Sequence, residues 1–167
     1  MTTCRPPSEA DVPALAALRN DLPTQYALLA SPRPNTHDDV RAWLARRSSD
    51  PAGLFNVVAD ETGAAVGFIQ IVGIDDRSRY GKFGIAIDER RRGCGHGRAA
   101  IEQTLEAARR DGRLDKLVLY VAADNAVAIA LYRATGFREV GVHRRHYFAP
   151  DGWRDVVVME RFLAAAP

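Results

Sequence analysis

The stretch from Ile85 to Arg98 constrains the fold of this chain more than any other segment. The apolar run that ends at Ile87 is typical of a strand, and residues 97–111 place apolar side chains at helical spacing. Between them lie three glycines, each separated from the next by one residue. Such glycines let successive main-chain N–H groups point into one hollow, and the helix that follows adds its positive end. The segment predicts a strand, an anion-binding loop and a helix in direct succession.

Two common phosphate loops do not match this spacing. The P-loop requires a lysine and then Ser or Thr after its last glycine, whereas Gly97 is followed by Arg98. The dinucleotide-binding motif requires two residues before its third glycine, and only His96 separates Gly95 from Gly97. Arg92 and Arg98 could add charge-assisted hydrogen bonds to a phosphate. The loop alone leaves a simpler alternative open, a capped helix start with solvated arginines.

The remaining sequence alternates between helical and strand patterns. Capping boxes at Ser8/Asp11 and Thr36/Asp39 open helices expected over about 8–19 and 36–47, and three prolines in 22–35 favour an irregular connector. Further helices are expected at 97–111 and 125–135, and strands at 54–59, 65–72, 80–87, 114–121, 137–142 and 153–162. This order predicts a mixed α/β protein whose largely antiparallel central sheet is flanked by helices.

The predicted strand at 80–87 has two unequal faces. Phe83, Ile85 and Ile87 share one face, and the other carries residues that are small near the end of the strand, Gly84 and Ala86. Glycine inside a strand often marks a close approach by a backbone or a ligand. We therefore expect this strand to border the site.

Composition limits the classes of protein that the chain can belong to. The 167 residues fit a single domain, 1–167, and a net charge of +2 gives no indication of a nucleic-acid partner. Cys4 and Cys94 have no metal-like or redox-like spacing, and no run approaches the about 18 apolar residues of a membrane span. We expect a soluble cytoplasmic protein without a metal site or a membrane anchor.

The helix predicted at 125–135 offers polar side chains on one face. Asn125, Ala128 and Tyr132 follow one another at intervals of three and four residues and so lie together. A separate stripe, Val127, Leu131 and Ala134, is expected to face the sheet. Taken singly, Asn125 is explained by a helix N-cap and Tyr132 by packing.

Two of these motifs resemble the GNAT superfamily of acyl-CoA N-acyltransferases. Arg92-Gly93-Cys94-Gly95-His96-Gly97 matches its Arg/Gln-x-x-Gly-x-Gly/Ala signature, and Asn125-x-x-Ala128-x-x-x-Tyr132 followed by Gly136-Phe137 matches its second characteristic segment. The closing stretch 151–159 resembles the branch that includes ribosomal-protein, polyamine and nucleotide-sugar amine acetyltransferases. The resemblance also implies a short first strand around Thr2–Cys4.

The resemblance implies acetyl-CoA as the donor in a direct transfer to a primary amine of a small molecule or a peptide terminus. The pyrophosphate would bind the main-chain amides of the glycine loop, and the pantetheine would pair with Ile85, Ala86 and Ile87 like an added strand. Tyr132 would protonate the departing thiolate. The residues expected to contact the cofactor are Ile85, Ala86, Ile87, Arg92, Gly93, Cys94, Gly95, His96, Gly97, Arg98, Asn125 and Ala128.

The general base and the acceptor are left open. Relatives often carry a glutamate where this chain has Lys82, so the remaining candidates are water or the side chains Asp75, Asp76, His143 and His146. Residues 20–36 and 143–153 are expected to frame the acceptor pocket, and the last strands could join two copies as a homodimer. One alternative function is an acyl-CoA-binding sensor or scaffold without turnover. Another is a nucleotide enzyme with a phosphate loop.

Overall fold

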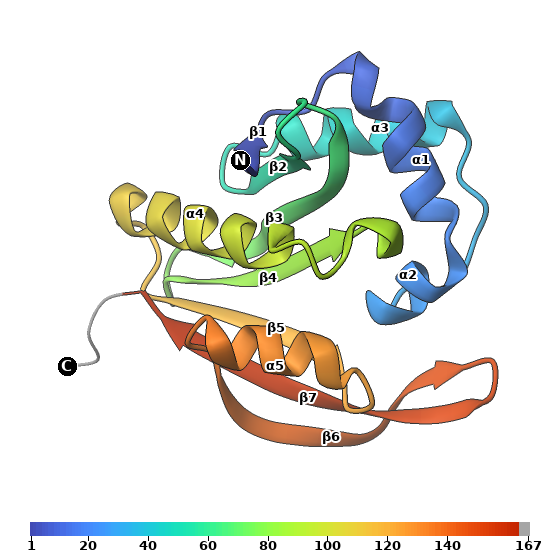
Figure 1. The fold of residues 1–167 in the computed structure, drawn as a ribbon. Coiled ribbons are helices and arrows are strands. Elements are labelled where there is room, and N and C mark those ends of the chain that lie inside the picture. The colour runs from blue at the N-terminus through green and yellow to red at the C-terminus, as the bar shows by residue number, and fades with distance from the viewer. Residues whose placement is uncertain (164–167) are drawn as a thin grey trace.

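The computed structural model describes residues 1–163, which form one sheet with helices on both faces (Figure 1). The strands are β1 (Thr3–Arg5), β2 (Leu54–Ala59), β3 (Ala65–Asp75), β4 (Tyr80–Ile87), β5 (Lys116–Ala122), β6 (Arg138–Ala149) and β7 (Gly152–Phe162). The helices are α1 (Val12–Asn20), α2 (Leu22–Ala27), α3 (His37–Ser48), α4 (His96–Asp111) and α5 (Ala126–Ala134), with short 3-10 turns η1 (Glu9–Asp11) and η2 (Glu89–Arg91). Among these described helices, none has the length and apolar character that a membrane crossing requires.

The seven strands lie in the order β1-β2-β3-β4-β5-β7-β6, and the β4–β5 pair is the parallel one. That pair is short, because it covers only residues 80–82 of β4 against 116–118 of β5. Beyond Lys82, β4 continues along β3, whereas β5 continues along β7. The two strands therefore diverge toward their carboxyl ends (Figure 1), and among the described strands neither has a partner on its facing edge there.

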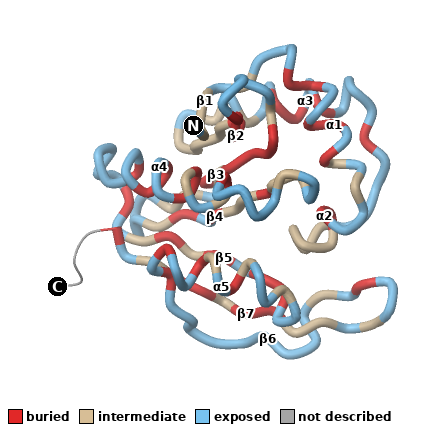
Figure 2. Tube along the Cα trace, viewed as in Figure 1, coloured by how far each residue is buried: buried red, intermediate tan, exposed pale blue. Residues whose placement is uncertain are grey.

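Two hydrophobic cores hold the sheet (Figure 2). The first lies under α4 and α5, where Ile101 and Ile129 meet Phe83 of β4. The second lies under α1 and α3 and takes Ala86 from the opposite face of β4. The predicted alternation of β4 is therefore confirmed, and so is the inward stripe of α4, which consists of Ile101, Leu105 and Ala108.

Three local predictions are wrong. The segment 22–35 was expected to be irregular, yet it begins with α2, because the Asp21 carboxylate accepts the amide of Thr24 (2.9 Å) and Pro23 lies in the first turn. On α5 the sheet-facing residues are Ile129 and Tyr132, while Val127 is 79% exposed. The strand predicted at 137–142 is longer than expected, since β6 runs to residue 149 through two register shifts.

Candidate acetyl-CoA and amine site

The glycine loop lies at the end of β4, directly before α4. Gly93 and Gly95 have φ angles of 76° and 82°, in the region that favours glycine, and a Cβ on either would meet no atom within 4 Å. Gly97 lies close to α5, since a Cβ there would lie 3.1 Å from the Leu131 side chain. The loop is thus left-handed at two glycines and open on the side where a ligand would approach.

Six successive main-chain N–H groups, those of residues 93–98, are available in this loop. Within the described residues, the amides of Gly93, Cys94 and Gly95 donate to no acceptor. The next three belong to the first turn of α4, where amides have no partner in the helix, and the first bond of that helix runs from Ala99 to the Gly95 carbonyl (3.0 Å). A cluster of this kind attracts an anion, and the positive end of the 16-residue helix adds to the attraction.

The basic residues around the loop are tied to neighbouring groups. Arg90 pairs with Asp88 (2.6 Å), and Arg91 pairs with Asp60 in the β2–β3 turn. Arg92 donates through Nε to the Ile87 carbonyl (3.0 Å). These contacts hold the turn that leads from β4 into the loop. Arg98, which is 59% exposed, pairs with Glu102 one turn further along α4.

The side chain of His96 does not face the predicted phosphate position. It is 6% exposed, and its Nδ1 lies 2.8 Å from the Thr2 hydroxyl beside β1. The imidazole is therefore engaged by Thr2, and the group of His96 that remains for a ligand is its main-chain N–H. Cys94, by contrast, is an exposed free thiol in the loop.

The edge of β4, and not its small-residue face, is the open surface. Ala86 is buried in the second core, and a Cβ at Gly84 would meet the Gln70 side chain at 3.5 Å. The bare face expected from these small residues is therefore covered. Within residues 1–163, the edge that carries Ile85, Ala86 and Ile87 has no strand partner on the β5 side, so its main-chain groups remain free for an extended ligand.

Tyr132 reaches from α5 toward β4. Its ring packs against Phe83 (centroids 6.3 Å apart) and Phe137 (5.8 Å), and the residue is 8% exposed. Within the described residues its hydroxyl has no hydrogen-bond partner, yet it is not among the fully enclosed atoms without one. Burial raises the pKa of Tyr132 to about 12. The phenol is therefore packed and protonated at neutral pH.

The polar neighbours of Tyr132 on α5 have local roles of their own. Asn125 caps the helix, and its Oδ1 accepts the amide of Ala128 (3.2 Å). Ala128 packs against the first core.

Of the side chains considered as a base, Asp75 and Asp76 lie where β3 turns into β4, and His143 and His146 lie on β6. Asp75 is paired with Tyr80 at the beginning of β4, the end opposite to the glycine loop, and its pKa is lowered mainly by the amide of Ser78. His143 and His146 stack on each other (4.6 Å) and are exposed on β6. Lys82, in place of the glutamate of relatives, is exposed.

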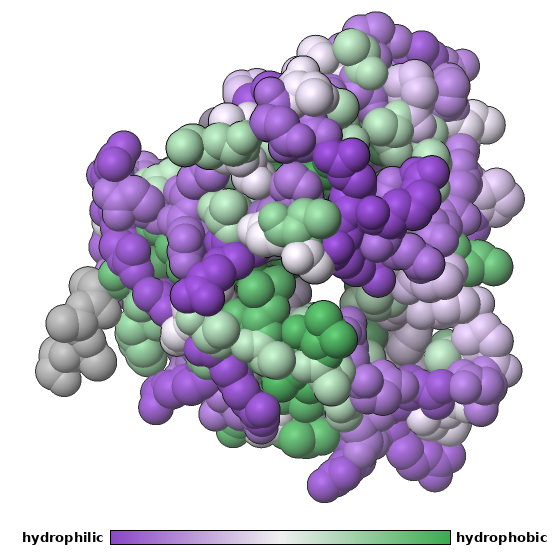
Figure 3. All heavy atoms as spheres, in the orientation of Figure 1, coloured by the Kyte–Doolittle hydropathy of each residue, from purple (hydrophilic) through white to green (hydrophobic). Residues whose placement is uncertain are grey.

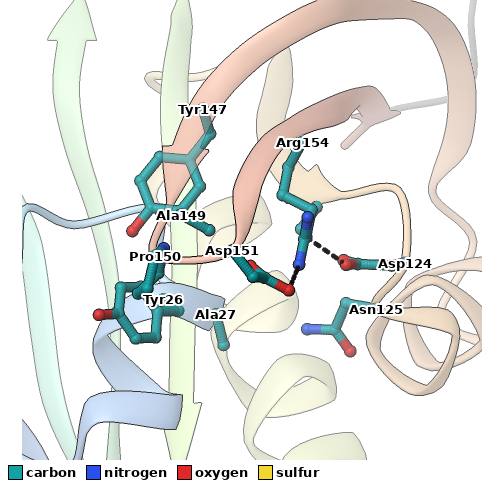
Figure 4. A pocket seen from close by; sticks show the side chains of 10 residues that line it. Tyr26, Ala27, Asp124, Asn125, Tyr147, Ala149, Pro150, Asp151 and Arg154 are labelled. Carbon is teal, nitrogen blue, oxygen red and sulfur yellow. Dashed lines mark hydrogen bonds and ion pairs between the residues drawn. The ribbon is translucent and has the colours of Figure 1, made fainter.

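A cavity of about 380 Å³ lies beside the carboxyl end of β5 (Figure 4). Its lining comes from α2, from the start of α5 and from the β6–β7 hairpin, and consists of Tyr26, Ala27, Ala122, Asp124, Asn125, Tyr147, Ala149, Pro150, Asp151 and Arg154. The two connectors predicted to frame an acceptor, 20–36 and 143–153, thus meet around one space. Figure 3 shows the molecular surface hollowed between the part that contains β1–β4 and the part that contains β5–β7.

Two long-range contacts hold this cavity. The Tyr147 hydroxyl donates to the Ala30 carbonyl (2.7 Å) and so ties β6 to the segment after α2. Arg154 contacts both Asp124 (2.7 Å) and Asp151, and these contacts join the hairpin turn to the loop before α5. Figure 4 shows this charged cluster beside the Asn125 side chain.

Several of these lining residues have no clear signal in the sequence. Tyr26 lies on the unpredicted helix α2, and no pattern marks it. Asp124 directly precedes Asn125, and Arg154 falls within the closing stretch that carries the family resemblance. Their positions next to family motifs could have indicated that the two charged residues, Asp124 and Arg154, lie near the site.

Comparisons with known proteins agree with this architecture. The family described as "Acetyltransferase (GNAT) domain" matches residues 2–138. The L-amino acid N-acetyltransferase AaaT of Escherichia coli strain K12 is 30% identical over 135 residues, which are 80% of this chain and 80% of that protein. The crystal structure of spermidine N-acetyltransferase from Vibrio cholerae, in complex with CoA and spermine, superimposes with a TM-score of 0.89 at 25% identity, covering 97% and 95% of the two chains.

A further relative matches over a shorter region. The [ribosomal protein bS18]-alanine N-acetyltransferase of Escherichia coli strain K12 is 39% identical over 77 residues, 46% of this chain and 51% of that enzyme. The match thus spans about half the length of that relative. The diverging strands and the loop of free main-chain amides thus belong to an acetyltransferase domain. The chain belongs to the GNAT acetyltransferase family.

Proposed function

We propose that this protein is an N-acetyltransferase that moves the acetyl group of acetyl-CoA directly to a primary amine. The observation that carries the proposal is the run of free N–H groups at residues 93–98, which follows β4 where this strand diverges from β5. Family membership supports the same activity. The acceptor is a primary amine of a small molecule or of a peptide terminus.

The residues around the loop fit the coenzyme. The amides of 93–98 would hold the pyrophosphate, because they point from a loop and a helix N-terminus and a Cβ at Gly93 or Gly95 would meet no atom within 4 Å. Arg92 and Arg98 are exposed beside the loop and would add charge-assisted contacts through their remaining N–H groups. The free edge of β4 at Ile85–Ile87 would bind the amide groups of the pantetheine arm as an added strand. Asn125 and Ala128 would line the other side of this arm from α5.

Acetyl-CoA supplies an activated thioester, and the protein has three tasks around it. A main-chain N–H at the end of β4 would stabilise the negative charge that develops on the carbonyl oxygen. Tyr132 would donate its proton to the leaving sulfur, because a phenol is protonated at neutral pH, and it would regain a proton from the solvent after the thiol leaves. Placing the amine in the cavity beside β5 would bring it next to the thioester and supply much of the rate through proximity.

The attacking amine must first lose a proton, since an alkylamine has a pKa near 10.4. The carboxylates that line the cavity, Asp124 and Asp151, are both in contact with Arg154. We therefore propose that water reached through the cavity carries this proton to the solvent, with no dedicated side chain.

Release of free thiol from acetyl-CoA tests the activity. The purified chain should release CoA only when an amine is present, and the acetylated amine should appear in equal amount by mass spectrometry. Tight CoA binding without turnover on any amine would contradict the proposal and favour the sensor. Competition by ATP for the CoA site would instead favour a nucleotide enzyme.

Two further proposals concern assembly and location. We propose a homodimer formed through β6, because this edge strand is exposed along nearly its whole length. A Vibrio cholerae spermidine N-acetyltransferase that shares the fold is described as dodecameric. Light scattering of the purified protein gives its mass in solution, and a monomer would contradict the dimer. A cytoplasmic location is consistent with the free thiols of Cys4 and Cys94, and cell fractionation tests it.

A further inference from the structure

Helix α2 forms one wall of the cavity beside β5, yet little apolar packing holds it. Its residues Tyr26 and Ala27 line the cavity. Among the described residues, neither hydrophobic core includes a residue of α2, and Leu22 at its start is 51% exposed. A helix of six residues is not stable by itself in water. Polar contacts are therefore needed to fix the position of this wall.

The side chain that anchors α2 is Gln25, which is 6% exposed. Its Nε2 donates to the carbonyl of Arg19 (2.8 Å), near the end of α1, and to the carbonyl of Arg33 (3.1 Å). Its Oε1 accepts the amide of Arg33 (2.8 Å). Both N–H groups and the oxygen of this amide are thus used, as the burial of a polar side chain requires. Gln25 therefore ties α2 both to α1 and to the connector that follows α2.

Asn35 completes the same network from the end of the connector. It is 7% exposed, although residues 31–34 are all exposed. Its Nδ2 donates to the same two carbonyls, those of Arg19 (3.1 Å) and Arg33 (3.0 Å). Its Oδ1 accepts Nε (3.2 Å) and Nη2 (3.0 Å) of the Arg19 side chain. The Arg19 guanidinium lies over the ring of Trp43 (4.2 Å), so the network is attached to the second core.

Side-chain bonds replace main-chain bonds in the segment 31–35. Its two prolines have no N–H to donate. The amide of Arg33 donates to the Gln25 side chain. The amide of Asn35 donates to Oδ1 of Asn20 (2.7 Å). The path of this segment therefore depends on buried amide side chains and not on a helix or a strand.

The β6 wall of the cavity is attached to the same connector. Tyr147, which lines the cavity, donates its hydroxyl to the carbonyl of Ala30 (2.7 Å). The amide of Ala30 in turn donates to the main-chain carbonyl of Gln25 (3.0 Å). Figure 4 shows Tyr26 and Tyr147 on one side of the cavity and Asn125 on the other. The anchor of α2 thus also sets the spacing of the two tyrosines.

We infer that the cavity beside β5 is formed before the amine binds, and that Gln25 is the positioning residue that holds Tyr26 at its wall. The inference rests on the proposed acetyl transfer and deepens it. Tyr26 contacts the acceptor, and Gln25 acts through Tyr26. Because a preformed wall need not be ordered on binding, the network lowers the KM of the amine and leaves the chemical step unchanged.

Amide hydrogen exchange of the free protein, followed by NMR, tests whether the wall is preformed. The amides of Arg33 and Asn35 have side-chain acceptors, whereas the amide of Ser31 has no acceptor within the described residues. We expect the protection factors of Arg33 and Asn35 to exceed that of Ser31 by at least about tenfold. Equal protection in the wild type would overturn the inference. This result needs no variant and no acceptor.

The substitution Gln25→Met tests the anchor itself. It keeps the approximate size of the side chain and removes its three hydrogen bonds. The amide of Arg33 should lose its protection, whereas the amides of the central strand β5 should keep theirs. Unchanged protection of Arg33 in a folded variant would contradict the role of Gln25.

Steady-state kinetics with 2-phenylethylamine as the probe test whether Gln25 acts through Tyr26. Gln25→Met and Tyr26→Ala should each raise the KM of the amine by about tenfold, the effect of about one side chain that must be ordered. The kcat and the Kd of CoA should stay within about twofold of the wild type. The double variant should show no larger KM than Tyr26→Ala alone. Additive effects, or a fall in kcat, would contradict the assignment.

Gln103→Met is the matched control. Gln103 on α4 likewise binds main-chain groups of a distant segment, the amide of Cys4 (3.0 Å) and the carbonyl of Thr2 (2.9 Å), and does not line the cavity. It should leave the KM of the amine unchanged, and an equal rise in both glutamine variants would overturn the assignment. Absence of turnover in the wild type, with CoA bound, would count against the proposed transfer. The exchange measurement would then decide by itself whether the wall is preformed.

Discussion

The carboxylate of Asp60, in the turn between β2 and β3, contacts the guanidinium of Arg91 at the entrance of the glycine loop. Asp60 is 4% exposed and also accepts the Thr62 hydroxyl (2.7 Å) and the Ala64 amide (3.1 Å). The hydrogen bond from Thr62 is the main reason that the pKa of Asp60 is lowered. The β2–β3 turn thus holds Arg91, whose position beside the loop would otherwise suggest that it binds a phosphate.

Asp60→Asn should therefore weaken CoA binding without any direct contact with the ligand. The amide cannot hold Arg91 as strongly, and the loop that presents the N–H groups becomes less ordered. We expect the Kd of CoA, measured by calorimetry, to rise several-fold. Asp111→Asn is the control, because Asp111 also pairs with an arginine, Arg113, but lies at the far end of α4. Equal effects of the two substitutions would contradict a specific role for Asp60.

Gly95→Asp should abolish measurable CoA binding. It adds strain at a φ of 82° and places a negative charge among the amides that would hold the pyrophosphate. Gly112→Asp is a matched control, since Gly112 caps the other end of the same helix with a φ of 70° and equally open surroundings. Both variants should show a similar decrease in melting temperature, and only Gly95→Asp should lose CoA binding. Retained affinity in Gly95→Asp would remove the loop from the binding site.

Tyr132→Phe should lower kcat and leave the Kd of CoA nearly unchanged. The ring would keep its packing against Phe83 and Phe137, and no hydrogen bond within the described residues is lost. General acid catalysis contributes about 10²–10⁴-fold, so kcat should fall by at least about a hundredfold. Tyr80→Phe, at the closed end of the β4–β5 pair, is the control and should keep full activity. A normal kcat in Tyr132→Phe would assign the phenol to packing alone.

The same phenol should make the protein sensitive to alkali. The folded pKa of about 12 lies above the ordinary value of 10, so the protonated form is favoured by folding. This contribution is complete below pH 10 and is lost as the pH rises toward 12. By pH 11 the loss should be about 1.4 kcal/mol of unfolding free energy. Urea unfolding at pH 9 and pH 11 should show this extra loss in the wild type and not in Tyr132→Phe, and parallel losses would contradict it.

Local patterns in the sequence predicted the loop and most elements, because each depends on neighbours a few residues away. Capping boxes and glycine spacing are of this kind, and so is the alternation of Phe83, Ile85 and Ile87. The inward face of α5 was misjudged, since Val127 and Ile129 are equally apolar and only the packed sheet distinguishes them.

The divergence of β4 and β5 and the cavity beside it could not be predicted from local patterns. The contact of Arg154 with Asp124 joins residues 30 positions apart, and the Tyr147–Ala30 hydrogen bond spans 117. Such contacts follow from the path of the whole chain. The candidate loop could therefore be predicted from the sequence, whereas the cavity beside β5 required the structure.

A crystal structure of the protein with bound CoA tests the central claim most directly, through two sets of distances. We expect the pyrophosphate oxygens to lie within about 3.2 Å of main-chain nitrogens of residues 93–98. We also expect the Tyr132 hydroxyl to lie within about 3.5 Å of the coenzyme sulfur. A coenzyme bound elsewhere, with the hollow above Gly93 and Gly95 empty, would contradict the claim, as would a sulfur on the far side of β4 from Tyr132.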